Sequence, residues 1–253
     1  MRLRFFYFQL LFSLLATLPA WGQTTVIKRT ETKQSPKPAK GGSRWESINE
    51  YHEGLAAVRD KNGKWGFIDK SGKLIIPCQW ESAWWFKEGL CQVRDSQNKY
   101  GFIDKTGKLI SPCQWEETCH FFVDGMAWVK DANNKYGFID KTGRVVIPCQ
   151  WRVAEWFLYG LAKVQDATNY KYGFIDKSGK VVIPCQWQYA SSFQGGLACV
   201  RDGNNKYGYI DTLGTIIIPC KWSWALDFHN GKASVRDDNG NWHHFNKQGE
   251  IID

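Results

Sequence analysis

The sequence predicts an all-β chain built as a tandem array of six three-stranded antiparallel units of about 35 residues. A tryptophan recurs at spacings of 35 or 36 residues, and a glycine or proline stands about every ten residues, which leaves room for strands but not for long helices. A unit this short cannot bury an apolar face alone, so neighbouring units must stack. The in-phase tryptophans are Trp45, Trp80, Trp115, Trp151, Trp187 and Trp222.

The residues before the array divide into two parts. Residues 1–22 have the layout of a secretory signal: two arginines, an apolar run, and small residues at Ala20 and Gly22. The apolar run has about 14 residues and a membrane-spanning helix needs about 20, so we expect a cleaved signal and no stable membrane span after cleavage. Residues 23–44 hold few large apolar side chains and are expected to form a flexible basic linker. The predicted destination is the periplasm or the extracellular space.

The positive charge of the chain lies mostly outside the repeats. Of the formal net charge of +8, residues 1–22 carry +2 and residues 23–44 carry +5, which leaves +1 for residues 45–253. A nucleic-acid-binding domain carries its basic footprint on the folded domain itself. Nucleic acid is therefore not an expected partner.

Each unit has the same order of strands and turns. An aromatic residue stands three residues before a glycine, as in Tyr51 and Gly54, and a first strand follows over residues 55–59. After a polar turn comes an aromatic-Gly-aromatic-Ile-Asp strand, residues 65–69 in the first unit. A second turn leads to an aliphatic run at 74–76, which a Pro-Cys pair closes. Strands of this length between turn residues indicate an antiparallel meander.

The first strand of each unit contains columns that differ in variability. Alternate side chains of a strand point to opposite faces, so a constant column indicates packing. The second residue after the glycine is Ala or Cys and the fourth is Val in every unit, whereas the third varies and is expected to meet solvent or a partner. The third residues are Ala57, Gln92, Trp128, Lys163, Cys199 and Ser234. The fifth residues form a mostly basic line: Arg59, Arg94, Lys130, Gln165, Arg201 and Arg236.

The repeated motif resembles the bacterial WG-repeat family, also called KWG repeats. Residues 64–77 read Lys-Trp-Gly-Phe-Ile-Asp-Lys-Ser-Gly-Lys-Leu-Ile-Ile-Pro, and close copies begin at Tyr100, Tyr136, Tyr172 and Tyr207. The sixth unit departs from the motif, because residues 242–246 read Trp-His-His-Phe-Asn and no Pro-Cys pair follows. The resemblance covers residues 45–253. It implies a β-rich repeat domain, common in exported bacterial proteins, with an interaction role and no catalytic residues.

Two arrangements of the units remain open at this point. An open solenoid-like or superhelical stack is favoured over a closed six-bladed propeller-like ring, because propeller blades usually have four strands and about 40–45 residues. The more polar last unit is also typical of a cap that faces water. The predicted units span residues 45–79, 80–114, 115–150, 151–186, 187–221 and 222–253.

The cysteines divide into in-phase and irregular positions. Equivalent thiols one three-stranded unit apart would lie about 14 Å from each other, too far for a disulfide, whose Cα atoms lie within about 7 Å. The in-phase thiols are therefore expected to be small buried residues, as is Cys91, which replaces an alanine. Cys119 and Cys199 fall at variable positions and are the expected reactive or pairing thiols. The in-phase thiols are Cys78, Cys113, Cys149, Cys185 and Cys220.

Catalytic and metal-binding patterns are weak in this sequence. Aspartates that recur in every unit before a turn are expected to bond the turn backbone, since catalysis needs one asymmetric constellation. The adjacent His243 and His244 would point to opposite faces of a strand and could not easily share a metal ion. We therefore expect no enzymatic activity, no cofactor and no metal site.

The candidate binding surface combines out-of-phase aromatics with the basic column. Aromatic side chains give a large contact area at a low entropic cost. The predicted function is an exported, non-enzymatic scaffold that binds a protein or peptide. The alternatives are binding of carbohydrate or cell-envelope glycan through exposed aromatics, and a purely architectural spacer. The candidate residues are Trp84, Trp85, Trp128, Trp156, Trp224, Arg59, Arg94, Lys130, Arg201 and Arg236.

Overall fold

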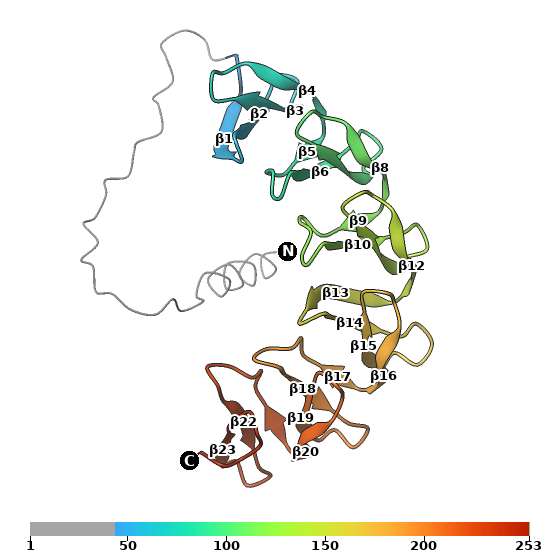
Figure 1. Cartoon of the computed structure of the whole chain (residues 1–253), viewed down its shortest axis with the longest axis vertical. Helices are drawn as coiled ribbons and strands as arrows, with labels where there is room; N and C mark the ends of the chain where they lie inside the picture. The colour runs from blue at the N-terminus through green and yellow to red at the C-terminus, as the bar shows by residue number, and fades with distance from the viewer. Residues whose placement is uncertain (1–43, 253) are drawn as a thin grey trace, which may run out of the picture. The chain divides into compact units, whose positions relative to one another are not determined.

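The computed structural model describes residues 44–252, which form six antiparallel sheets that follow one another in sequence order (Figure 1). The predicted signal, residues 1–22, and nearly all of the predicted linker lie outside the described residues. Strands that are neighbours in sequence are neighbours in the sheet, so each sheet is a meander. None of the described residues belongs to a helix long and apolar enough to cross a lipid bilayer.

The first three sheets have closely similar strands. Sheet 1 consists of β1 (Ser47–His52), β2 (Leu55–Arg59), β3 (Trp65–Asp69) and β4 (Leu74–Trp80). Sheet 2 consists of β5 (Ser82–Ala83), β6 (Leu90–Arg94), β7 (Tyr100–Asp104) and β8 (Leu109–Trp115). Sheet 3 consists of β9 (Glu117–Thr118), β10 (Met126–Lys130), β11 (Tyr136–Asp140) and β12 (Val145–Trp151).

The last three sheets repeat this order with one omission. Sheet 4 consists of β13 (Val153–Leu158), β14 (Leu161–Gln165), β15 (Tyr172–Asp176) and β16 (Val181–Trp187). Sheet 5 consists of β17 (Tyr189–Ala190), β18 (Leu197–Arg201), β19 (Tyr207–Asp211) and β20 (Ile216–Trp222). Sheet 6 consists of β21 (Trp224–Ala225), β22 (Ala233–Arg236) and β23 (Trp242–Phe245).

Five of the six sheets have four strands, where the sequence predicted three. The additional strand follows each in-phase tryptophan, and from Trp80 on that tryptophan ends the last strand of the preceding sheet. It has only two residues in β5, β9, β17 and β21, too few to show an alternating pattern in the sequence. In sheet 6 the last strand is reduced to an isolated bridge between Phe245 and Ile251, which leaves three strands.

The aromatic-glycine pair that marks every unit is explained by the close approach of the last strand. A Cβ atom added to Gly66 would lie 2.5 Å from the carbonyl oxygen of Ile76 and 2.8 Å from the backbone nitrogen of Cys78. The ladder between β3 and β4 shifts register at this point. The same crowding recurs at Gly101, Gly137, Gly173 and Gly208. Glycine is therefore required for space and not for an unusual φ.

Consecutive sheets pack face to face, and the hydrophobic core lies between them. Between sheets 1 and 2, Leu55, Phe67 and Ile76 pack against Phe86 and Val93. The rings of Phe67 and Phe86 meet edge to face at a centroid distance of 4.8 Å. Four further clusters join sheets 2 and 3, 3 and 4, 4 and 5, and 5 and 6 in the same way. The repeated positions therefore form the core, as the constant columns predicted.

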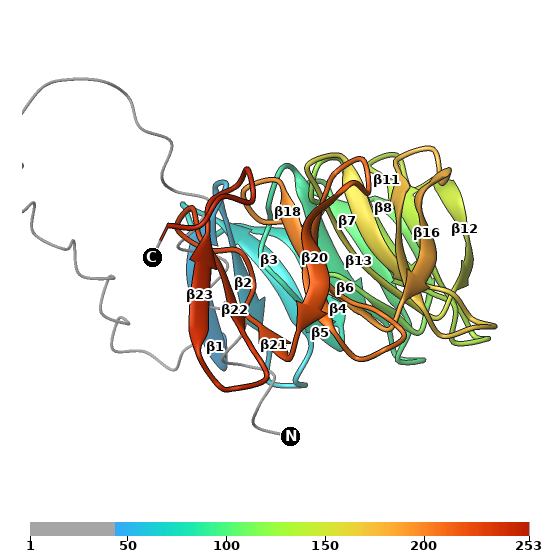
Figure 2. The same cartoon turned by 90° about the horizontal axis from the view of Figure 1, so that it is seen from below.

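The strands of neighbouring sheets run roughly along a common line, so their turns gather along two opposite sides of the array (Figure 2). At one turn the Asp69 carboxylate accepts the backbone N–H of Ser71 at 2.8 Å and of Lys73 at 3.1 Å. The in-phase aspartates of the other units bond their turns in the same pattern. These bonds confirm the turn role predicted for the repeated aspartates.

Candidate binding surface

The variable third column does not face solvent, and that prediction was wrong. Ala57, Gln92 and Cys199 are only 3%, 5% and 1% exposed, and Trp128 is half-buried. Both faces of an internal sheet are covered by a neighbouring sheet, so the alternation of a strand does not reach water. The third residue lies on the face that meets the next sheet.

Two polar members of this column bond the next sheet directly. The side-chain Nε2 of Gln92 donates to the carbonyl oxygens of Thr118 at 3.1 Å and Cys119 at 3.3 Å. The ammonium of Lys163 donates to the carbonyl oxygen of Ala190 at 3.0 Å. A buried polar group needs such a partner, because leaving it unpaired costs about 1–3 kcal/mol. The side chain at the third position therefore varies because it bonds or packs against a different neighbouring sheet in each unit.

A second set of non-repeating residues stands next to the in-phase aromatics, within the first strand of a sheet or between its first and second strands. We name it the variable strip. His52 stacks on Trp85 across sheets 1 and 2, at a centroid distance of 5.3 Å. The hydroxyl of Ser192 donates to Glu155 Oε2 at 2.6 Å across sheets 4 and 5. The variable strip comprises His52, Trp84, Trp85, His120, Phe121, Glu155, Trp156, Ser191, Ser192 and Asp227.

The first half of the variable strip is aromatic. Trp84 and Trp85 stack at 4.7 Å, and Trp84 also stacks on His120 at 4.2 Å. Phe121 lies 5.0 Å from Trp85, with tilted planes. The rings therefore follow the order His52, Trp85, Trp84, His120 over three consecutive sheets. Four of these five side chains are half-buried, and Phe121 is buried.

A hydrogen bond to Gln92 of the preceding sheet fixes the orientation of the His120 ring in this stack. Because Gln92 Nε2 donates to two carbonyls, its Oε1 is the acceptor for His120 Nδ1, 3.0 Å away. His120 is therefore protonated on Nδ1. Burial lowers the pKa of His120, and Glu117 opposes this only in part. The imidazole is neutral at pH 7 and stacks on Trp84 as an uncharged ring.

Trp156 continues the aromatic half into sheet 4. It lies against Cys119, the residue before His120, in the core cluster between sheets 2 and 3. It also precedes the in-phase Phe157, which is 1% exposed. The aromatic half thus extends over residues contributed by four consecutive sheets.

The second half of the variable strip is polar. The ammonium of Lys163, whose side chain is 10% exposed, lies 2.8 Å from Glu155 Oε1. Both oxygens of Glu155 are engaged, since Oε2 accepts the hydroxyl of Ser192. Burying a cation is costly unless it is paired and hydrogen-bonded, and this arrangement meets both conditions. The Lys163–Glu155 pair therefore orders the polar half.

Asp227 ends the variable strip in sheet 6. Desolvation raises the pKa of its carboxyl, and Glu155 adds to the rise, while Lys163 and a hydrogen bond with Ser191 oppose it. The carboxylate of sheet 6 thus interacts with side chains of sheets 4 and 5. Contacts of non-repeating residues are in this way continuous from sheet 1 to sheet 6.

The structure separates the ten candidate residues into groups. Trp84, Trp85 and Trp156 lie in the variable strip, whereas Trp128 fills the gap between sheets 3 and 4. Trp224 is 46% exposed and lies outside the strip. The basic column forms a row of its own, in which each residue pairs in register with the first aromatic of the next strand. Its members are Arg59, Arg94, Lys130, Arg201 and Arg236.

Sequence reasoning missed part of the variable strip. His120, Glu155, Ser191 and Asp227 were not selected, because no single one of them forms a recognisable motif. The signal that could have found them is positional. The pair of residues before each in-phase aromatic differs from unit to unit, and comparison of those two columns would have identified most of the strip.

The expectations for the thiols were partly wrong. Cys119 and Cys199, expected to be reactive or paired, are 2% and 1% exposed. Burial raises the pKa of Cys119 to about 12, so its reactive thiolate form is scarce at neutral pH. Cys91 is buried, as expected, but the five in-phase thiols are half-buried. All eight cysteines are free.

The repeats identify the family of the chain. The profile of the WG containing repeat matches six consecutive segments, residues 44–65, 65–99, 100–136, 136–167, 172–207 and 207–242. The chain belongs to the WG containing repeat family. No curated protein matches this WG repeat chain.

Two solved structures are similar to the WG repeat chain at low identity. BamB from Moraxella catarrhalis is 11% identical with a TM-score of 0.39, over 82% of this chain and 75% of that chain. The WD40 β-propeller domain of Doa1 is 10% identical with a TM-score of 0.33, over 84% of this chain and 86% of that chain. Neither likeness is high enough to carry an argument about the function of the WG repeat chain.

Proposed function

We propose that the chain is an exported, non-enzymatic WG repeat scaffold that binds a protein or peptide through the aromatic half of the variable strip. One observation carries this proposal: side chains that differ from unit to unit contact one another over consecutive sheets. The repeating side chains are used in packing between sheets. A surface made of unit-specific residues can select one partner, as the binding faces of other repeat proteins do.

The composition of the aromatic half fits a protein or peptide partner. Tryptophan is enriched in the residues that dominate protein interfaces, where it fills a desolvated pocket. Half-buried rings that already contact one another lose little freedom when a partner covers them. His52 stands at one end of the stack and supplies the ring that a partner would first meet.

Carbohydrate binding, the alternative, fits this half less well. A sugar ring stacks on an exposed aromatic face. Here Trp85 stacks with both His52 and Trp84, and Trp84 with both Trp85 and His120. The ring faces are therefore used within the stack, and edges remain for a ligand. Apolar and polar peptide side chains can use such edges.

An open row of sheets is the arrangement that best supports this function. In sheets 1 to 5 the residue after the turn glycine is apolar and buried, as Leu55 is, but in sheet 6 it is the exposed Lys232. The position of Phe67 is occupied in sheet 6 by His244, whose Nδ1 lies 2.9 Å from Ser234 Oγ. A polar outer face suits a cap against water and would not match the apolar face of another sheet.

Export rests on the signal-like residues 1–22 and places the scaffold in the periplasm or the extracellular space. Expression of the full chain in a bacterial host, followed by mass measurement of the mature product, tests this part. A product that begins near Gln23 supports export. An uncleaved chain in the cytoplasm would contradict it.

The binding proposal is tested with peptides displayed on phage and selected on the full chain. Dissociation constants of the selected peptides are then measured for the wild type, for Trp85→Ala and for His52→Ala. The control is Leu213→Ala, which removes an apolar side chain that is 80% exposed and outside the strip. We expect both strip variants to weaken binding at least about tenfold, because truncating a central interface residue typically costs about 2 kcal/mol or more.

Two outcomes would overturn the proposal. The selection could enrich no peptide, or the strip variants could bind as tightly as Leu213→Ala. Thermal unfolding of each variant shows whether a loss of binding accompanies a loss of fold, and His52→Ala, at the end of the stack, keeps the test valid if Trp85→Ala unfolds. A glycan array probed with the wild type tests the carbohydrate alternative.

A further inference from the structure

In sheet 5 an arginine of the second strand has a tyrosine in register on each neighbouring strand. Arg201 of β18 pairs in register with Tyr189 of β17 on one side and with Tyr207 of β19 on the other. Its guanidinium carbon lies 5.7 Å from the centroid of the Tyr207 ring. A guanidinium stacked on an aromatic ring keeps its N–H groups available in the plane of the group.

Sheet 6 repeats this arrangement with tryptophans. Arg236 of β22 pairs with Trp224 of β21 and with Trp242 of β23. Its guanidinium carbon lies 5.9 Å from the Trp242 ring centroid. Trp224 and Trp242 are 46% and 43% exposed. Exposed aromatic side chains that lie together are typical of a surface that a partner covers.

The two arrangements are joined into one surface. The Tyr207 and Trp224 rings meet across sheets 5 and 6 at a centroid distance of 5.4 Å, and Tyr189 lies 6.3 Å from Tyr207. Sheets 1 and 2 have a serine, Ser47 or Ser82, at the position of Tyr189. We name the group the arginine–aromatic surface. It comprises Tyr189, Arg201, Trp224, Arg236 and Trp242, which lie around the buried Tyr207 ring.

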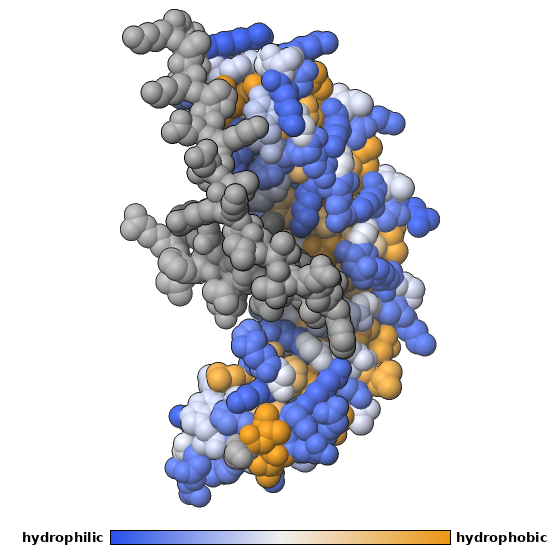
Figure 3. Space-filling view, turned by 60° about the vertical axis from the view of Figure 1, so that its left-hand side comes forward, coloured by the Kyte–Doolittle hydropathy of each residue, from blue (hydrophilic) through white to orange (hydrophobic). Residues whose placement is uncertain are grey.

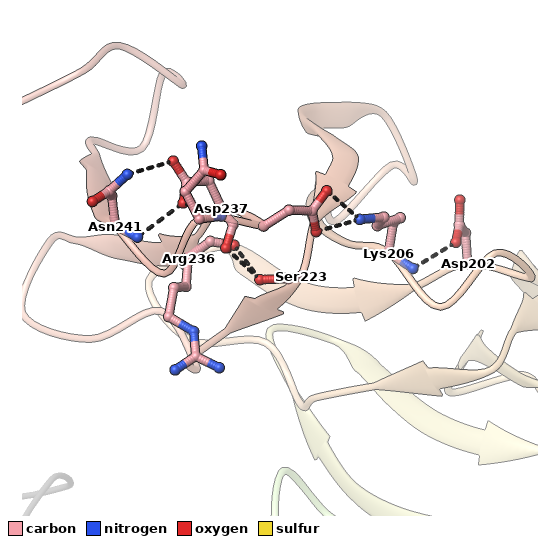
Figure 4. A network of polar contacts seen from close by, with 8 residues as sticks. Asp202, Lys206, Ser223, Arg236, Asp237 and Asn241 are labelled. Carbon is pink, nitrogen blue, oxygen red and sulfur yellow. Dashed lines mark hydrogen bonds and ion pairs between the residues drawn. The ribbon is translucent and has the colours of Figure 1, made fainter.

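Carboxylates near the arginine–aromatic surface bond other groups. Asp237 accepts the backbone N–H groups of Asn239 at 2.9 Å and Asn241 at 2.8 Å, and Asp238 binds Lys206 at 2.6 Å. Figure 4 shows this network, with the Arg236 guanidinium extending away from the Asp237–Asn241 turn. The contacts of that turn do not neutralise Arg236.

Sheets 1 and 3 differ from sheets 5 and 6 in this respect. Arg59 binds Glu46 at 3.3 Å, and Lys130 binds Glu117 at 3.7 Å, so the basic column there is paired within the chain. The residue that follows the in-phase tryptophan is Glu46 in sheet 1 but Ser223 in sheet 6. In sheets 1 and 3 a glutamate of the same sheet pairs with the basic residue. In sheets 5 and 6 neutral residues occupy the positions of these glutamates.

We propose that the arginine–aromatic surface is a second docking surface, in addition to the aromatic half of the variable strip, for an acidic segment of a protein partner. Arginine, tyrosine and tryptophan are the residues most enriched in the dominant contacts of protein interfaces. Guanidinium groups bind carboxylates through two parallel hydrogen bonds, and the flanking rings exclude water around such pairs. An acidic segment would replace the glutamates that the first sheets supply.

The test uses the full chain and fluorescent poly-L-glutamate as the probe, with affinity measured by anisotropy at one fixed ionic strength. The double variant Arg201→Gln, Arg236→Gln is compared with Arg59→Gln, Lys130→Gln. Both lower the net charge by the same amount and both keep the basic linker. We expect the first to weaken binding about tenfold, because two charge-assisted contacts are removed, and the second to stay within about twofold.

A third variant separates charge from ring contact. Trp224→Ala, Trp242→Ala leaves the net charge unchanged and is expected to weaken poly-L-glutamate binding several-fold. Equal losses in the two charge variants, or no loss in any of the three, would overturn the proposal. Sodium polygalacturonate serves as the second probe. A loss specific to Arg201→Gln, Arg236→Gln with this glycan alone would replace the acidic segment by an anionic glycan.

Discussion

At the scale of single residues, a close backbone contact explains why the second residue of each aromatic-Gly motif is a glycine. The carbonyl of the last strand approaches Gly66 so closely that no side chain fits. Sheet 6 lacks that strand, and there the equivalent position is His243. The one exception to the motif therefore occurs where its steric cause is absent.

The first prediction concerns this glycine. Gly137→Ala would place a Cβ atom 2.5 Å from the carbonyl oxygen of Ile147 and is expected to lower the free energy of unfolding by about 1–3 kcal/mol. The midpoint of thermal unfolding should fall by roughly 2–10 °C. Gly203→Ala is the matched control, because its Cβ would meet no atom within 4 Å. Equal melting temperatures for the two variants would contradict the steric account.

The second prediction concerns the thiols. Alkylation of the native chain at pH 8 should modify the in-phase cysteines slowly and leave Cys91, Cys119 and Cys199 unmodified. Burial raises the pKa of Cys113, Cys149 and Cys220 to about 11, so their rates should rise with pH. Peptide mass spectrometry assigns the sites, and full labelling in denaturant is the control. Preferential labelling of Cys119 would be the opposite result.

The sequence predicted the constant positions well and the variable ones poorly. Ala56 and Val58 recur in phase and are fully buried. Gln92 and Cys199 vary, but they are buried too, because a second sheet covers the face that alternation assigned to water. Variation at one position among the repeats of a chain shows that the surroundings of that position differ from repeat to repeat. It does not distinguish a neighbouring sheet from solvent.

At the scale of strands and turns, most polar contacts hold the turns and connect neighbouring sheets. Glu53 of the first unit accepts the backbone N–H groups of Glu88 at 2.6 Å and Gly89 at 2.9 Å in the second. Lys105 binds the same carboxylate at 3.0 Å. Hydrophilic side chains cover much of the described surface in Figure 3, in keeping with this distribution of polar contacts.

The last strand of each four-stranded sheet is an edge strand that carries an exposed proline. Proline cannot donate to a further strand, so it opposes pairing between the edges of two molecules. The edge strands β4, β8, β12, β16 and β20 would otherwise expose free backbone groups (Figure 1). The prolines are Pro77, Pro112, Pro148, Pro184 and Pro219.

The third prediction is a pH dependence that arises from the turn aspartates. Hydrogen bonds, first from Thr106, lower the pKa of Asp104 from 3.8, and bonds from Asn241 lower that of Asp237 to about 2. A depressed pKa in the folded state adds stability that is complete above the unfolded value and is lost as pH falls through the folded value. The loss should lie between about pH 4 and pH 2.

Asp104→Asn measures this contribution at one turn. At pH 6 its midpoint of thermal unfolding should lie below that of the wild type, because the amide lacks the carboxylate charge. Toward pH 2 the difference should shrink, since protonation of the wild-type carboxyl removes its charge. A difference of the same size at both pH values would show that the turn bonds do not depend on ionisation.

The prediction from sequence was weaker for strands than for residues. The second, third and fourth strands of sheet 1 were located from glycine spacing and aliphatic runs. The first strand was missed in every sheet, and in sheet 2 that strand, β5, has only two residues and is defined only by its pairing with β6. A strand that short depends on its partner and not on its own propensity.

At the scale of the whole repeat region, stability comes from contacts between successive sheets. The clusters that join sheets each combine residues of neighbouring sheets, as Phe102 of sheet 2 does with Phe122 of sheet 3. Stability in such a stack is the sum of unit terms and nearest-neighbour terms. In the open row proposed above, an inner sheet has two stabilising neighbours and an end sheet has one.

Hydrogen exchange of the full chain, read peptide by peptide by mass spectrometry, tests this account most directly. In an open row of sheets that are held by their sequence neighbours, amides of β10, β11, β14 and β15 should be the most protected. Protection should fall toward β2 and β3 at one end and β22 and β23 at the other. Equal protection in all six sheets would contradict the account and would indicate that sheet 6 packs against sheet 1.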